Sequence, residues 1–429
     1  MRILIVGAGI AGLTTALSLD AADVAREIQV IDSAAELRPL GVGINLLPHA
    51  TRELIDLGLG PELAQIGVPT SEVVVMDVFG SRIWREPRGL GAGYHWPQYS
   101  IHRGELQAML LAAVRDRLGP DSVRTGCAFV DLTQSGDRVV SRILDRKSRR
   151  IEDVESDIVI GADGLHSTVR AQFHPDEGPP RPSGITMWRG CAPWEPFLTG
   201  ESMMWAGSNR VAKFVAYPIS PARDEHGRVL TNWVAEVRGE TASAPAADWN
   251  RTGRLDDVTP HFEGWTLAGV DVCELMASSP QVLEYPMVDR DPLPFWGHGR
   301  VTLLGDAAHP MYPIGSNGGS QAVLDARYLA WALAHADDPV AGLADYEAVR
   351  RPPTAAIVLA NRGFPMDPIL NLVADRAPQG FEAIEDVLSP PELTMINQAL
   401  RSTTGTDAKE LNLRASLDVV RQRLPGARP

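Results

Sequence analysis

The sequence predicts an α/β fold: a Rossmann-like nucleotide-binding domain with an inserted, mostly antiparallel β-sheet domain and a C-terminal helical segment. The first observation is the apolar run at residues 3–6, which leads into Gly7-x-Gly9-x-x-Gly12 and a helical pattern. The second is the Trp- and Pro-rich region from about 179 to 286, which contains several strand-like runs. The third is the predominance of helical patterns after residue 319.

The composition excludes several classes of protein. The chain has 429 residues, 44% hydrophobic and 22% charged, as is typical of a globular protein of two or three domains. Its 40 basic and 54 acidic residues give a net charge of −14, which argues against nucleic acid or an anionic membrane as partner. No apolar run reaches the ~20 residues of a membrane span, and no signal-peptide pattern is present. Cys127, Cys191 and Cys273 lie far apart without metal-ligand spacing. We therefore expect a cytoplasmic protein without a metal site.

The N-terminal unit carries the signature of dinucleotide binding. Its glycines allow a tight turn, close approach of the backbone to a pyrophosphate and close packing of the helix. The N-terminus of that helix supplies amide donors and a positive dipole for phosphates. Asp32 ends the next predicted strand, where a carboxylate can accept hydrogen bonds from ribose hydroxyls.

Apolar periodicity predicts the remaining elements. Alternation begins near residue 71, where Val73 and Val75 indicate a strand. The others, in chain order, are helices near 54 and at 104–118, strands on either side of 135–136 and at 157–161, strands at 185–189, 203–206, 211–219 and 229–237, a parallel-type strand at 300–304, and a helix from 319 past 331. The pattern beyond is mostly helical, including 408–424, with an interruption expected at Pro352-Pro353.

Two later motifs indicate which dinucleotide is bound. Residues 161–170 read GADGLHSTVR and residues 305–313 read GDAAHPMYP, each after a predicted strand, and Gly315-Ser316-Asn317-Gly318 follows. This set resembles the flavoprotein aromatic hydroxylases, single-component FAD monooxygenases with the para-hydroxybenzoate hydroxylase fold. The resemblance implies a glutathione-reductase-type FAD-binding domain, with FAD as cofactor and NADH or NADPH as transient cosubstrate. No second glycine fingerprint follows a strand, so the nicotinamide would bind without a domain of its own.

The resemblance divides the chain into six segments. Residues 1–70, 100–180 and 287–362 would form the FAD-binding domain, and residues 71–99 and 181–286 the substrate domain. Residues 363–429 would form a helical tail.

The resemblance also assigns FAD contacts. Asp32 would serve the adenosine end and Asp306 the ribityl chain, and Asp163 belongs to a motif linked to both FAD and nicotinamide. Backbone amides near Asn317 would stabilise negative charge on the pyrimidine edge of reduced flavin. The implied contacts are Gly7, Gly9, Gly12, Asp32, Arg38, Gly43, Arg103, Gln107, Asp163, Asp306, Gly315, Asn317 and Gly318.

Each polar residue in that set also has a structural interpretation. Asp163 and Asp306 are suited to capping a helix or a turn. Arg38 and Arg103 fit exposed surface positions. We interpret His166 and His309 as structural, and Arg170 as a salt-bridge residue of the fold.

Within the family, four segments are similar to the methylphenazine-carboxylate monooxygenases. They are residues 38–45, 97–107, 184–190 and 285–294. The similarity covers roughly residues 2–362, but residues 201–210 diverge and the tail has no counterpart. The implied reaction uses NAD(P)H to reduce FAD, forms a flavin C4a-hydroperoxide with O2, and transfers one oxygen atom to an aromatic ring. A phenazine carboxylate or another N-heteroaromatic or phenolic acid would be the substrate, and loss of carbon dioxide stays open.

The substrate pocket is expected between the flavin and the inserted sheet, with aromatic walls and a few polar groups. The candidates are Asn45, Arg189, Trp205, Tyr217 and Met311, with Trp188 and Trp233 as further aromatic residues. Successive strand residues face opposite sides, so Arg189 and Trp188 cannot both face the ligand. Arg189, Arg210 or Lys213 could meet a substrate carboxylate. No catalytic residue is assigned; Tyr217 could deprotonate a phenol or orient the ring.

Two other functions stay open. A related FAD enzyme could catalyse epoxidation or Baeyer–Villiger oxidation. An FAD-binding redox-responsive protein could act through a partner, supported by the tail alone. The quaternary structure expected is a monomer or homodimer.

Overall fold

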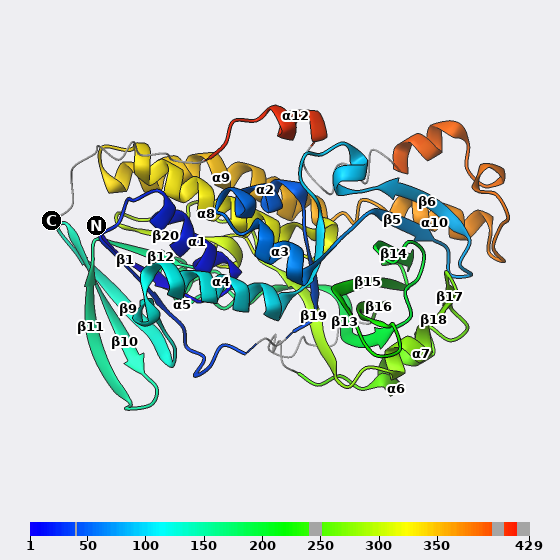
Figure 1. Cartoon of the computed structure of the whole chain (residues 1–429), viewed down its shortest axis with the longest axis horizontal. Helices are drawn as coiled ribbons and strands as arrows, with labels where there is room; N and C mark the ends of the chain where they lie inside the picture. Colours follow the sequence, from blue (N-terminus) through cyan, green and yellow to red (C-terminus); the bar gives the residue numbers. More distant parts are fainter. Residues whose placement is uncertain (39–40, 240–250, 397–406, 418–429) are drawn as a thin grey trace.

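The computed structural model describes residues 1–38, 41–239, 251–396 and 407–417. A five-stranded parallel sheet, in the order β20-β12-β1-β2-β8, forms the centre of the FAD-binding part (Figure 1). Its strands are β1 (Arg2–Val6), β2 (Glu27–Ile31), β8 (Val123–Arg124), β12 (Ile158–Gly161) and β20 (Val301–Leu303). The apolar run that predicts β1 is buried because α1 (Ile10–Ala21) packs against the sheet, and apolar residues of the strands at 127–156, such as Phe129 and Ile143, belong to the same core.

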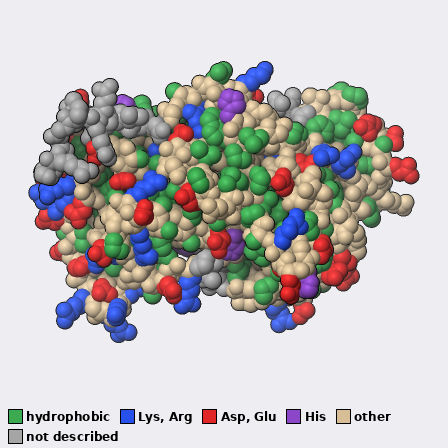
Figure 2. All heavy atoms as spheres, viewed as in Figure 1, with side chains coloured by type: hydrophobic (Ala, Val, Ile, Leu, Met, Phe, Trp, Pro, Cys, Tyr) green, Lys and Arg blue, Asp and Glu red, His purple; other side chains and the backbone are tan. Residues whose placement is uncertain are grey.

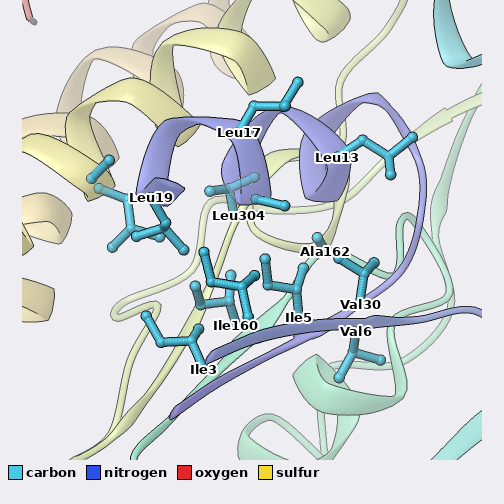
Figure 3. Packing of buried hydrophobic residues seen from close by; sticks show 14 of the residues in the cluster. Ile3, Ile5, Val6, Leu13, Leu17, Leu19, Val30, Ile160, Ala162 and Leu304 are labelled. Carbon is cyan, nitrogen blue, oxygen red and sulfur yellow. The ribbon is translucent and has the colours of Figure 1, made fainter. Parts of the chain in front are cut away.

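Helix α1 (Ile10–Ala21) shows how these layers pack. Leu13, Leu17 and Leu19 are completely buried and belong to one apolar cluster with Ile3, Ile5 and Ile160 of β1 and β12 (Figure 3). Helices α4 (Arg103–Leu118) and α8 (Asn317–His335) pack against α1 on either side. This interdigitated layer fixes the N-terminus of α1 at the carboxyl end of β1.

An antiparallel hairpin sheet extends from this part. Strands β9 (Cys127–Ser135), β10 (Arg138–Asp145) and β11 (Arg150–Ser156) form it, and they project at one end of the molecule (Figure 1). The turn between β9 and β10 falls at the predicted Ser135-Gly136, where Gly136 has a φ of 61°. Glycine adopts this left-handed conformation without steric cost.

The second large sheet has seven strands in the order β19-β13-β16-β15-β14-β5-β6. Its strands are β5 (Glu72–Met76), β6 (Arg82–Pro87), β13 (Arg181–Trp194), β14 (Ser202–Gly207), β15 (Ala212–Arg223), β16 (Val229–Arg238) and β19 (Val282–Asp289). All neighbouring pairs are antiparallel except β14 and β5. The sheet therefore joins residues 72–87 to strands that lie more than 90 residues later in the chain.

The two faces of this sheet have different neighbours. One face packs against α6 (Leu255–Val258) and α7 (Val272–Ala277) through a core that includes Trp188, Phe214 and Trp233. The other face carries Val75, Met203 and Tyr217 and packs against α10 (Asp367–Arg376) of the tail. We call this second face the inner face.

A small three-stranded sheet connects the two large ones. It consists of β3 (Gly43–Leu46), β7 (Tyr99–His102) and β4 (Gly67–Pro69). Helices α2 (Pro48–Asp56) and α3 (Gly60–Ile66) lie between β3 and β4 in the chain.

The prediction of a break at Pro352-Pro353 is wrong, because α9 (Pro339–Asn361) runs through both prolines. Both prolines are exposed, so the carbonyl groups that they leave without an amide partner can bond water. Arg350, Thr354 and Val358 are buried on the other side and hold the helix against its neighbours. Tertiary packing thus outweighs the local cost of proline.

The tail contains α10, a 3-10 turn (Ile384–Asp386), residues 391–396 in helical conformation, and α12 (Ala408–Leu413). The predicted helical stretch 408–424 is borne out over α12, whereas residues 418–424 lie outside the described residues. Acidic and basic side chains are interspersed over the face shown in Figure 2. In the described ranges no helix has the length and apolarity needed to cross a membrane.

Candidate functional site

The glycine turn after β1 has the shape of a phosphate cradle. A Cβ atom on Gly7 would lie 2.3 Å from the Ala162 carbonyl oxygen, and one on Gly12 would lie 1.9 Å from the Gly7 oxygen. These two glycines are required because protein backbone fills the space. A Cβ atom on Gly9 would meet nothing within 4 Å, so Gly9 borders open space. Gly9 is also the N-cap of α1 and provides no side-chain cap, which leaves the first amides of the helix for an anion.

Two side chains hold this turn in place. The Asp32 Oδ2 atom accepts a hydrogen bond from the Ala8 amide at 2.8 Å, and Oδ1 accepts one from the Ala34 amide at 2.8 Å. Gln107 donates from Nε2 to the Ala8 carbonyl at 2.8 Å. The structure thus brings Asp32 and Gln107 to the same loop, and the Asp32 oxygens keep lone pairs for a ribose.

Asp306 lies in the 3-10 turn η4 (Gly305–Ala307) that follows β20. Its side chain is exposed and accepts no hydrogen bond from any residue that the structure describes. Loss of hydration among the surrounding protein atoms raises the pKa of Asp306, while His309 and Arg103 act in the opposite direction. Gly318 lies close by, since its Cβ position is 4.0 Å from Asp306 Oδ1. The structure therefore places Arg103 and Gly318 near the Asp306 carboxylate, which is open to a ligand.

The turn that carries Asp306 is held from one side by Asp325 of α8. Asp325 Oδ2 accepts a hydrogen bond from the Gly305 amide at 3.1 Å and lies 2.5 Å from His309 Nε2. Arg350 donates from Nε to Asp325 Oδ1 at 2.7 Å. Burial raises the pKa of Asp325, but His309 and Arg350 outweigh it and hold this pKa below its usual value. His309 is thus a structural residue with a charged partner.

Arg170 holds the same turn from the other side. Its Nη1 atom donates to the carbonyl oxygens of Ala307 at 3.1 Å and Ala308 at 3.0 Å. It also forms an ion pair with Glu177. The interpretation of Arg170 as a salt-bridge residue agrees with these contacts.

Sequence reasoning missed Asp325 and Arg350. Asp325 is a lone acid in an otherwise apolar stretch, residues 322–326, of a helix whose residues there are all buried. A charge at such a position needs a partner, and this signal could have identified it. Its partner Arg350 follows on the next helix, and no local spacing in the sequence connects the two.

The loop before α8 contains two consecutive residues in the left-handed region of backbone conformation. Gly315 has a φ of 68° and Ser316 a φ of 59°, and α8 begins at Asn317 without a side-chain cap. Asn317 is buried and accepts a hydrogen bond from Gln321 at 3.5 Å. The open amides at this helix N-terminus suit a group with negative charge.

Two other predicted cofactor residues have local contacts. Both oxygens of Asp163 are used at the start of α5 (Thr168–Phe173), where Oδ2 accepts from the Thr168 amide at 2.7 Å and Oδ1 from the Ser167 hydroxyl. These contacts agree with a capping role. Arg38 is exposed and pairs with Glu36 at 2.8 Å, so the structure does not bring it to the other FAD candidates.

The inner face of the seven-stranded sheet meets β3 at Gly43. The Tyr217 hydroxyl donates to the Gly43 carbonyl at 3.0 Å, and Arg189 Nη2 donates to the same oxygen. Arg189 Nη1 also donates to the Tyr285 hydroxyl at 3.1 Å. A Cβ atom on Gly43 would lie 2.7 Å from the Tyr217 ring, so only glycine fits here. Burial raises the pKa of Tyr217 to about 12, so its phenol stays protonated and donates rather than acting as a base.

The remaining pocket candidates are scattered. Asn45 is buried and accepts from the Ser100 hydroxyl at 2.8 Å. Trp205 lies on the inner face with its ring centroid 5.4 Å from Lys213 Nζ. Met311 is half-buried in the segment between η4 and α8. Trp188 and Trp233 lie in the core on the opposite face, as strand alternation requires once Arg189 faces inward.

Comparison with known proteins identifies the class. The family model described as FAD binding domain matches residues 1–245 and 288–361. The chain therefore belongs to this family and is an FAD-dependent flavoprotein of the aromatic hydroxylase type.

Individual relatives are similar to this chain over most of its length. The chain is 52% identical over 363 residues to phenazine 1,6-dicarboxylic acid hydroxylase PhzS of Lysobacter antibioticus, covering 84% of this chain and 89% of that protein. It is 35% identical to 3-hydroxybenzoate 6-hydroxylase 1 of Aquipseudomonas alcaligenes, covering 84% and 88%. The fold is similar to that of Klebsiella pneumoniae HpxO complexed with FAD and uric acid, with a TM-score of 0.72, 22% identity, and coverage of 96% and 95%.

Proposed function

We propose that this enzyme hydroxylates a phenazine carboxylate or a closely related N-heteroaromatic acid, with NADH or NADPH and O2 as cosubstrates. The observation that carries the proposal is the 52% identity to a phenazine dicarboxylic acid hydroxylase over 84% of this chain. The identity to a benzoate hydroxylase over the same share is 35%. Whether carbon dioxide is lost during the reaction is an outcome of the experiment below.

The residues present fit FAD. The open Asp306 carboxylate would hold the ribityl hydroxyls, and the free amides at the start of α1 would hold the phosphates. The amides of residues 315–318 would face the pyrimidine edge of the flavin, where they favour negative charge. Bound FAD supplies electron transfer from the nicotinamide and activation of oxygen. The chain's own residues bind the flavin, orient the aromatic ring and exclude water.

The inner face of the sheet provides the environment for an aromatic substrate. Tyr217 and Arg189 reach Gly43 from this face, and Met187, Tyr285 and Tyr312 form an apolar cluster beside them. Apolar walls with few polar groups are typical of sites for planar organic ligands.

The test is turnover by purified, FAD-loaded protein with a panel of aromatic acids that includes phenazine-1-carboxylic and phenazine-1,6-dicarboxylic acid. NADH and NADPH oxidation, oxygen uptake and product mass are followed together. A phenazine acid that accelerates NAD(P)H oxidation and gains one oxygen atom supports the proposal, and a further loss of carbon dioxide identifies the decarboxylative reaction. Stimulation by hydroxybenzoates alone would contradict it.

We further infer a cytoplasmic protein that acts as a monomer or homodimer without a nucleic-acid partner. The net charge of −14 and three cysteines that form no disulfide support this inference. Sedimentation of the loaded enzyme with and without nucleic acid tests the oligomeric state and the absence of a nucleic-acid partner.

A further inference from the structure

We propose that Arg189 of β13 receives the carboxylate of the aromatic substrate and so makes the enzyme selective for aromatic acids. The inference rests on the proposed function, because it assigns one polar contact within the same site. It selects one residue among the three cations named above as possible partners of a substrate carboxylate, Arg189, Arg210 and Lys213.

The other two cations already have carboxylate partners. Arg210 pairs with Asp375 of α10 at 2.9 Å, and both side chains are exposed. Lys213 pairs with Glu236 of the neighbouring strand at 3.3 Å, and both are largely buried. A substrate carboxylate would have to displace these partners, so neither residue offers a free positive charge.

Arg189 has no acidic partner among the residues that the structure describes. Its hydrogen bonds go to two neutral groups, the Gly43 carbonyl and the Tyr285 hydroxyl. Its Nε atom is buried and has no hydrogen-bond partner in the same described part. A guanidinium has five N–H donors in a fixed fork. Leaving some of them unpaired at a buried position is costly unless a ligand supplies acceptors.

The contact to Gly43 does not by itself account for a charged residue. Tyr217 already donates a hydrogen bond to the same carbonyl oxygen. A neutral side chain would serve to join β3 to the sheet without placing a charge there. The positive charge of Arg189 is therefore available for a ligand.

The surroundings of Arg189 suit an aromatic ring. Met187, two residues along β13 and on the same face, belongs to an apolar cluster with Tyr285, Met287 and Tyr312. On the other side, Val234 is the cross-strand neighbour of Arg189 and packs in one cluster with Tyr217. A cation between two apolar groups matches a planar ring that carries one carboxylate. Arginine is the cation best suited to it, because its fork binds a carboxylate with two parallel bonds.

The test compares binding of phenazine-1-carboxylic acid with binding of its neutral carboxamide, each measured on the FAD-loaded enzyme by perturbation of the flavin absorbance. In R189M the affinity for the acid should fall about 10- to 100-fold, while that for the carboxamide changes about 2-fold or less. R189K should give an intermediate value, because it keeps the charge and loses the fork. In turnover, R189M should raise KM for the acid more than it lowers kcat. Arg210→Met is the matched control and should leave the ratio of acid to carboxamide affinity unchanged.

An unchanged ratio in R189M would overturn the proposal and leave Arg189 as a residue that only joins β3 to the sheet. If R189M does not retain FAD, the same ratio in R189K decides. The binding assay needs no NAD(P)H, so its result is separate from that of the proposed function. Wild-type enzyme that binds the acid through Arg189 but adds no oxygen would contradict the proposed reaction and leave this inference standing.

Discussion

Asp306 lies in the ordered turn η4, but no described residue donates a hydrogen bond to its carboxylate. Asp306→Ala should therefore lose affinity for FAD by about 10- to 100-fold, the value of hydrogen bonds to a charged group. Flavin fluorescence during titration with FAD measures it. Asp271→Asn, at the exposed N-terminus of α7, is the control and should retain FAD. Stoichiometric flavin in purified Asp306→Ala would contradict the site.

The raised pKa of the buried Tyr217 phenol predicts how the stability of the protein changes at high pH. Because burial raises its pKa from 10.0 to about 12, the unfolded chain loses this proton first as the pH rises. The stability that this residue contributes is thus complete below about pH 10 and falls through pH 12. At pH 11 the free energy of unfolding of the wild type should have dropped by about 1 kcal/mol more than that of Tyr217→Phe. Urea unfolding of both proteins at pH 8 and pH 11 measures this, and parallel losses would refute it.

At the residue scale, the sequence could predict groups whose neighbours lie on the same motif. The glycine turn and Asp32 come from one strand–turn–helix unit, and the structure places them together. Asp325 and Arg350 could not be paired in advance, because their contact depends on how α8 and α9 pack. Trp188 shares β13 with Arg189, and Trp233 lies on the neighbouring strand β16. The sequence does not show which face of the sheet Arg189 occupies, and that choice places both tryptophans in the core.

At the scale of elements, α8 contributes to stability and to FAD binding through one buried acid, Asp325. Asp325→Ala should lower the free energy of unfolding by about 3–5 kcal/mol, because His309 and Arg350 would stay buried without their partner. FAD affinity should fall as well, since the turn of Asp306 loses its hydrogen bond to Asp325. Thermal denaturation with and without FAD measures both effects.

The control for this element is Asp338→Ala, which removes the exposed N-cap of α9. This substitution should lower the free energy of unfolding by about 1 kcal/mol and leave the affinity for FAD unchanged. Equal effects of the two variants on FAD binding would contradict the role given to Asp325.

Element boundaries were predictable to within one residue where periodicity was strong, as in α4, β14 and β16, whereas β13 and β15 extend about four residues or more beyond the predicted strands. The parallel pairing of β14 with β5 was not, because it joins segments about 130 residues apart and no local signal encodes it. The continuous helix through Pro352-Pro353 shows the same limit, since exposure of the two prolines follows from packing.

At the scale of the whole molecule, the tail covers the inner face of the large sheet. Ile369, Leu370 and Val373 pack in one cluster with Tyr217 and Val75. Arg414 then pairs with buried Glu53 of α2 at 3.1 Å, which joins the tail to the FAD-binding part. A protein that lacks residues 364–429 should lose several kcal/mol of stability and its turnover, because a face of the core becomes exposed.

Thermal denaturation and NAD(P)H oxidation by the shortened protein measure this loss. The milder variant Leu370→Ala should lower the free energy of unfolding by about 2–5 kcal/mol and keep FAD bound. If the shortened protein kept its stability but lost only a response to a partner, the redox-responsive alternative would gain support. Unchanged stability and turnover together would show that the tail does not complete the core.

The pairing of Arg414 with Glu53 also bears on the order in which the protein is made. These residues are 361 positions apart, so a segment that is synthesised late closes a contact with one that is synthesised early. Until residues 366–373 emerge, the apolar side chains of the inner face that they cover are exposed to other nascent chains. The fold can therefore be completed only after these residues have been synthesised, and premature termination near residue 362 should produce chains that require chaperones.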